Sequence, residues 1–142
     1  MKNIIKSASI FLLLSCSTGS QPINYGKDNC DFCKMTIMDQ KFGTEIVTKK
    51  GKIYKFDSDE CMRNFYNKNI SEIVTFEYIY VADYANPGGL SNGKLAFYLH
   101  GPKVKSPMGG NLAAFSKKVD AEDFQKKLGG EILTFDQMLL TE

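Results

Sequence analysis

Residues 51–76 read GKIYKFDSDECMRNFYNKNISEIVTF, and residues 110–135 read GNLAAFSKKVDAEDFQKKLGGEILTF. Aligned without a gap, the two stretches share eight identical residues in 26 positions. Three aromatic pairs are among the identities: Phe56 and Phe115, Phe65 and Phe124, and Phe76 and Phe135. Self-similarity at one fixed offset indicates an internal repeat. The chain is therefore expected to contain two copies of one structural unit.

The first copy shows what that unit is. Residues 43–49 and 53–56 are rich in apolar and β-branched residues on either side of a Lys-Gly-Lys turn, which is typical of a hairpin. Asp57 is expected to cap a helix, with an acid three residues later and apolar residues then recurring at helical spacing. The β-branched and aromatic run 73–81 predicts a third strand.

These elements predict the fold class. We expect an α+β protein with two tandem ββαβ units, at about 41–85 and 92–141, packed into one compact domain over 29–142. The Pro- and Gly-containing stretch from Asp83 to Gly93 is expected to connect the two units.

The N-terminus is typical of a secretion signal. Lys2 and Lys6 precede an apolar run too short to span a bilayer as a helix, and Leu13-Leu14-Ser15-Cys16 resembles the lipobox of bacterial lipoproteins. We expect residues 1–15 to be removed, Cys16 to be lipidated, and 16–28 to serve as anchor and tether. An ordinary signal followed by a free cysteine is the alternative.

The length and net charge of the expected mature chain limit the number of domains and the kinds of binding partner. Cleavage before Cys16 would leave 127 residues, enough for one domain, with 16 basic and 16 acidic side chains. A nearly neutral chain without a basic patch argues against nucleic-acid binding.

Sulfur is concentrated in CDFCKM, residues 30–35. On an extended segment Cys33 and Met35, two residues apart, point to the same side. A third sulfur, Met108, lies in SPMGG, within a loop that the first repeat lacks, and such an insertion is a candidate for function. Packing of this loop onto the domain is the alternative reading of Met108. Met62 and Met138 lie on apolar helical faces and are expected in the core, as is Cys61.

Three kinds of chemistry fit these residues. Thiolate and thioether ligands select Cu(I). A zinc site would use Cys30, Cys33, Cys61 and His100, but it lacks the second short ligand pair that closed zinc sites usually have. A Cys30/Cys33 dithiol would make a redox protein, although no strand leads into the motif as in thioredoxin-like folds.

Catalysis has no support in the sequence. The acidic residues do not form a pair within an apolar segment, and with a single histidine no Ser/His/Asp triad can be recognised. No phosphate-binding glycine loop follows a predicted strand. The protein is therefore expected not to be an enzyme.

The lipobox, CxxCxM, the GKxYxFD stretch with a Cys-Met after it, and SPMGG followed by an Ala-Phe strand together resemble the NosL family of copper-binding lipoproteins. The resemblance covers essentially the whole mature chain. It implies two ββαβ units similar to the fold of an organomercurial lyase, without that activity. It also implies a monomeric, periplasm-facing Cu(I) chaperone.

The family's copper ligands fall on Cys33, Met35 and Met108, with Cys30 and His100 as candidates for a further metal or redox role. The family implies nitrous oxide reductase as the copper acceptor and an ABC transporter complex as a helper. Ser17 after the anchor mildly favours the outer membrane. Lys34 stands where glycine is frequent, so the turn there is expected not to be left-handed, and the Lys34 ammonium is a candidate to favour the Cys33 thiolate. A thiol–disulfide protein and a copper or mercury sensor remain as alternatives.

Overall fold

The first unit forms a four-stranded antiparallel sheet in the order β2-β1-β3-β4. Its elements are β1 (Thr44–Thr48), β2 (Ile53–Phe56), α1 (Asp59–Lys68), the 3-10 helix η1 (Ile70–Thr75), β3 (Phe76–Ala82) and β4 (Leu90–Asn92). The computed structural model describes residues 19–142, apart from the side chains of Ile73 and Val74. The predicted signal sequence and the lipidation site Cys16 lie outside the described residues.

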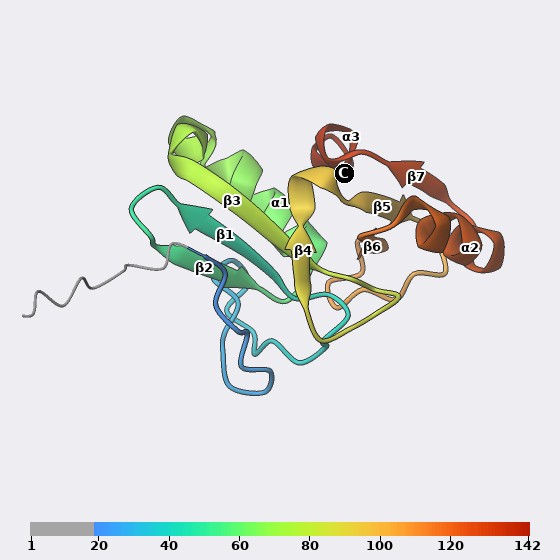
Figure 1. Cartoon of the computed structure of the whole chain (residues 1–142), viewed down its shortest axis with the longest axis horizontal. Helices are drawn as coiled ribbons and strands as arrows, with labels where there is room; N and C mark the ends of the chain where they lie inside the picture. Colours follow the sequence, from blue (N-terminus) through green and yellow to red (C-terminus); the bar gives the residue numbers. More distant parts are fainter. Residues whose placement is uncertain (1–18) are drawn as a thin grey trace, which may run out of the picture.

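The second unit forms a three-stranded sheet in the order β6-β5-β7. Its elements are the short 3-10 helix η2 (Gly93–Leu95), β5 (Phe97–His100), β6 (Leu112–Phe115), α2 (Lys118–Leu128), β7 (Glu131–Leu133) and α3 (Phe135–Leu139). The order β6-β5-β7 repeats β2-β1-β3, so the predicted pair of ββαβ units is confirmed. Figure 1 shows the two sheets side by side. Within residues 19–142, none of the helices has the length and apolar character needed to cross a bilayer.

The repeated phenylalanines have the same role in both units. Phe56 and Phe115 end equivalent strands and are fully buried. Each packs on the phenylalanine of its own helix, with ring centroids 5.1 Å apart for Phe56 and Phe65 and 5.4 Å apart for Phe115 and Phe124. Pairs of a buried and a half-buried aromatic ring of this kind contribute to a core, which explains why these positions match across the repeat.

The end of the repeat does not keep the same structure in both copies. The predicted strand over 73–81 was wrong only at its first three residues, because they belong to η1 and β3 begins at Phe76. Local bonds hold η1: Glu72 N donates to Asn69 O at 2.8 Å, and Thr75 Oγ1 donates to Glu72 O at 2.6 Å. The matching residues of the second copy form β7 instead. The connector also holds the unpredicted strand β4, paired with β3.

Helix α1 joins the two units. It packs on β1 and β2 of its own sheet and on β6 of the other. Its cap is Ser58, whose hydroxyl accepts from Cys61 N at 3.3 Å, so the prediction of Asp57 as cap was wrong. Because Ser58 does the capping, the Asp57 carboxylate is left for other contacts.

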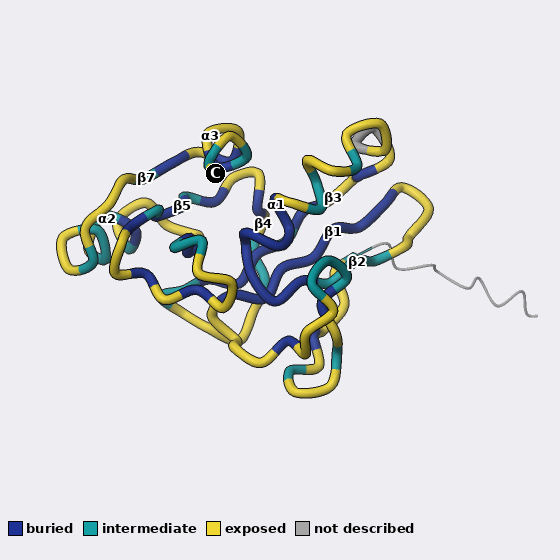
Figure 2. Tube along the Cα trace, turned by 180° about the vertical axis from the view of Figure 1, so that it is seen from behind, coloured by how far each residue is buried: buried dark blue, intermediate teal, exposed yellow. Residues whose placement is uncertain are grey.

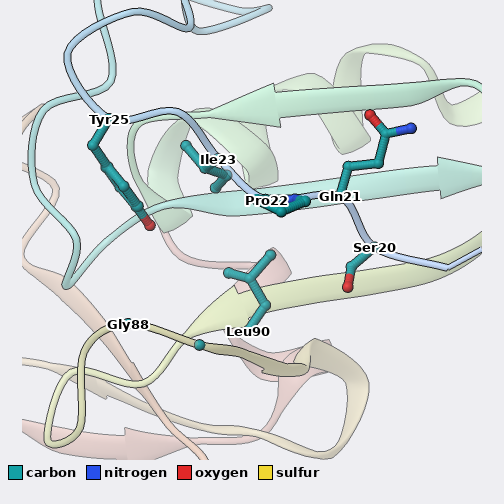
Figure 3. A pocket seen from close by; sticks show the side chains of 8 residues that line it. Ser20, Gln21, Pro22, Ile23, Tyr25, Gly88 and Leu90 are labelled. Atoms are coloured by element: carbon teal, nitrogen blue, oxygen red, sulfur yellow. The ribbon is translucent and has the colours of Figure 1, made fainter.

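The segment before β1 lies along the first sheet, below β1 and β2 in Figure 1. Ile23 is buried in the main core, although it falls in the stretch expected as tether. Figure 2 shows β1 itself as a dark, buried strand. A cavity of about 290 Å³ lies between Ser20–Tyr25 and the residues around Leu90 of β4 (Figure 3). No thiol or thioether lines it.

Glu45 in β1 is a buried acid whose pKa is raised by burial. Its Oε2 accepts from Gln21 N at 3.2 Å, while Oε1 has no hydrogen-bond partner among the described residues. The native state therefore holds this proton more tightly than the unfolded chain, and stability from this site falls as pH rises above the unfolded value near 4.5.

Glu45→Gln should therefore raise the free energy of unfolding by about 1 kcal/mol at pH 8, with a smaller gain at pH 4. The amide retains the acceptor for Gln21 and carries no charge. Denaturant unfolding at both pH values checks this, with the exposed Glu77→Gln as control. An equal effect at the two pH values would contradict the role given to ionisation.

Candidate metal centre

The CDFCKM motif is folded into a closed turn. Cys30 N donates to Met35 O at 2.8 Å, and Lys34 N donates to Cys30 O at 2.9 Å. Asn29 and Thr36 form an isolated antiparallel bridge just outside these bonds. The backbone therefore fixes where the two cysteine side chains of the motif begin.

This turn is attached to the free edge of β2. Asp31 N donates to Lys55 O at 2.8 Å, and Lys55 N donates back to Asp31 Oδ2 at 2.7 Å. The Lys55 ammonium also lies 2.7 Å from Asp28 Oδ2, and this lowers the pKa of Asp28. The edge strand of the sheet is thus covered, and the motif is held against the body of the protein.

Lys34 has a φ of 68°, in the left-handed region. The expectation that this turn is not left-handed was therefore wrong. The closed turn requires the conformation, which costs a non-glycine residue about 1–2 kcal/mol. Lys34 Nζ donates to Asp31 O at 2.6 Å, which ties the side chain to its own turn. The ammonium is not among the groups that shift the pKa of Cys33.

Three cysteines and one carboxylate meet where the turn faces helix α1. One ligand atom from each of Cys30, Cys33, Asp57 and Cys61 lies within 4.8 Å of all the others. The three cysteines are free thiols in the described part of the chain. Cys30 and Cys61 are buried and Cys33 is partly exposed. This grouping can hold a metal ion that favours sulfur.

The surroundings of Cys30 favour its thiolate. The Cys61 thiol donates to its sulfur, and the backbone N–H groups of Cys33, Asp57 and Phe32 add to this, lowering the pKa of Cys30 to about 6. The same contact raises the pKa of Cys61, together with burial and the nearby Asp57. The cluster therefore favours the thiolate form at its buried end.

Asp57 faces the same sulfurs. The Cys33 thiol donates to Asp57 Oδ2 across 3.7 Å, while Oδ1 finds no hydrogen-bond partner among residues 19–142. Burial raises the pKa of Cys33, and the charges of Cys30 and Asp57 add to the effect. A cation placed here would reverse this repulsion, because it would attract every one of these groups.

The first turn of α1 also holds the SPMGG loop. Glu60 is buried, and its Oε1 accepts hydrogen bonds from Ser106 Oγ and, at 3.2 Å, from Leu112 N. Ser106 Oγ in turn accepts from Asn111 N at 2.9 Å, closing the loop around Met108. The loop of the second unit is thereby attached next to Cys61 of the first.

Both predicted thioether ligands are exposed. Met35 is 59% exposed and Met108 is 44% exposed, whereas Met62 and Met138 are fully buried, as predicted. His100 ends β5, paired with Leu112 and Glu131. It is not a member of the thiol cluster, so the structure does not bring His100 together with the three cysteines of the zinc alternative.

The sequence did not indicate Asp57 or Glu60 as part of this centre, because both were assigned to the helix start, and it favoured the core for Cys61, with a ligand role only in the zinc alternative. A signal was present in the repeat. Asp57, Asp59, Glu60 and Cys61 align with Ser116, Lys118, Val119 and Asp120. The acids of the first copy are therefore not required by the ββαβ unit, and this difference marks the first turn of α1 as specialised.

The fold and this centre define a class: an α+β protein of two ββαβ units with a thiol-rich candidate metal centre between the N-terminal turn and α1. The model of the NosL family matches residues 23–141. The chain belongs to the NosL family.

Two relatives illustrate the similarity. The "Copper-binding lipoprotein NosL" of Stutzerimonas stutzeri is 28% identical over 128 residues, covering 83% of this chain and 67% of that protein. The crystal structure of the copper chaperone NosL from Shewanella denitrificans matches with a TM-score of 0.74 and 26% identity, covering 84% of this chain and 95% of that one.

Proposed function

We propose that this protein binds Cu(I) through Cys33, Met35 and Met108 and passes the ion to a copper-requiring protein. The proposal rests on the start of α1 and the residues just before it, which contact both the cysteine turn and the Met108 loop. Asp57 and Cys61 contact the cysteine turn, while Glu60 holds the Met108 loop. The cysteine turn and the Met108 loop, whose sulfur residues lie 73–78 positions apart in the sequence, are thus attached to the same end of one helix.

The ligand chemistry favours Cu(I) over harder ions. A thiolate with two thioethers is a soft donor set, and thioethers are poor ligands for zinc or magnesium. Both methionines are more than two-fifths exposed. A partner's ligand can therefore approach the ion before the last ligand here leaves, and the ion need not pass through solution.

The family relationship supports the cellular role. Its relatives are named as a copper-binding lipoprotein and a copper chaperone, and chaperones of this kind carry metal rather than catalyse a reaction. We propose a monomer, anchored through Cys16 on the periplasm-facing side of a membrane, with the outer membrane favoured. Nitrous oxide reductase is the proposed acceptor, with an ABC transporter complex as helper.

Met108→Ala should lower the affinity for Cu(I) by about 10- to 100-fold, a loss of the size found on disturbing a metal site. The measurement is an anaerobic competition titration against a Cu(I)-chelating dye. Met38→Ala is the matched control, because Met38 is 68% exposed and lies three residues after Met35. The ligand assignment fails if the two variants lose affinity equally.

A further inference from the structure

We propose that Cys30, Cys33 and Cys61 form a second, buried position for the same Cu(I) ion, sharing Cys33 with the methionine position. The inference rests on the proposed function, because copper is taken as the cargo. It assigns Cys61 and Cys30 as ligands, with Asp57 beside them, and it gives the ion an inner and an outer position.

The spacing of the sulfurs fits one ion. Three sulfurs around a metal at a bond length of about 2.3 Å, as for zinc thiolates, lie about 4 Å from one another. The three thiols and the Asp57 carboxylate already lie within 4.8 Å of one another without any disulfide. Small side-chain rotations are enough to complete the site, so the backbone of the turn and of α1 need not move.

The groups around the thiol cluster favour a bound cation. Three backbone N–H groups, from Phe32, Cys33 and Asp57, lie against the Cys30 sulfur. Asp57 is 4% exposed, and its Oδ1 has no partner among the described residues. A buried carboxylate oxygen without a partner is costly, and a bound cation beside it would offset that cost.

Burial separates the two positions. Met35 and Met108 are 59% and 44% exposed, whereas Cys30 and Cys61 are 0% and 1% exposed. Cys33 is intermediate. A single ion can therefore be captured at the exposed thioethers and drawn inward as Cys30 and Cys61 replace them. The thiol protons leave to solvent as the sulfurs bind, and the copper keeps its oxidation state.

The test compares two kinds of variant in the same anaerobic Cu(I) competition titration. The double variant Met35→Ala/Met108→Ala removes only exposed side chains, so its fold should be retained. It should still bind one Cu(I), and X-ray absorption should show sulfur ligands only. Adding Cys61→Ala to this double variant should lower the remaining affinity at least tenfold. Met62→Leu, adjacent and equally buried, is the control and should leave the affinity of the same double variant unchanged.

Each outcome decides a different claim. If the double methionine variant loses all binding, or keeps its affinity when Cys61→Ala or Cys30→Ser is added to it, the inner position is overturned while the proposed function stands. Retention of one Zn²⁺ by the cluster in the presence of excess Cu(I) would also overturn it, because the thiols would then be a structural zinc site. A wild-type protein that binds no Cu(I) would overturn the proposed function itself.

Discussion

Replacing Cys33 with alanine should abolish tight Cu(I) binding, and the affinity should fall by more than about 100-fold. Loss of a residue that only supports a metal ligand costs up to about 100-fold in affinity, and loss of a ligand itself should cost more. Cys33 is the proposed thiolate donor of the methionine position and a member of the buried cluster, so its loss would remove a ligand from both. Met35 and Met108 alone are neutral thioethers and cannot balance the charge of the ion. The measurement is competition against a Cu(I)-chelating dye without oxygen.

The neighbouring Lys34→Gly is the control for this experiment. Lys34 has a φ of 68°, which glycine adopts without strain, and its ammonium bonds Asp31 O within the turn. The variant keeps the closed turn and should bind Cu(I) as the wild type does. Tight binding by Cys33→Ala would place the site elsewhere and contradict the ligand assignment.

Gly110→Ala should lower the free energy of unfolding by about 3 kcal/mol, the upper part of the range for overpacking. A Cβ at this position would lie 2.1 Å from Glu60 Cγ. Glu60 cannot turn aside at little cost, because it is buried and accepts hydrogen bonds from Ser106 and from the backbone of Leu112. The same displacement would detach the Met108 loop from α1, so Cu(I) affinity should fall as well.

Gly109→Ala separates this clash from ordinary backbone strain. Gly109 has a φ of 72°, but a Cβ there would meet no described atom within 4 Å. Its substitution should cost only the left-handed strain of about 1–2 kcal/mol. Denaturant unfolding of the metal-free proteins gives both values. Equal losses for the two variants would show that the contact between Gly110 and Glu60 does not constrain the loop.

The fold could be predicted because the repeat preserves what the core requires. Phe56 and Phe115 occupy equivalent buried positions and pack on equivalent helical phenylalanines. The identical residues of the repeat therefore marked positions with the same packing in both units. The prediction failed where local hydrogen bonds decided the structure. Residues 70–75 have β-branched members but close 3-10 turns on Asn69 and Glu72, and propensity alone does not detect such bonds.

The site was predictable only in part, for a related reason. Cys33, Met35 and Met108 stand out in short motifs, and their sulfur alone suggests a metal. Asp57 and Glu60 are acids at a helix start, where capping is the ordinary explanation. Their burial depends on a turn and a loop that are distant in sequence, and a single sequence does not show those contacts. Lys34 was misjudged because its left-handed conformation follows from the closed turn around it.

The most direct test of the central claim is an anaerobic Cu(I) titration of the soluble protein that starts after Cys16, in competition with a Cu(I)-chelating dye. We expect one tightly bound Cu(I) per chain, withdrawn from the dye at stoichiometric protein. A protein that leaves the copper with the dye, while its three thiols remain reduced and titratable, would contradict the proposal that this protein carries copper.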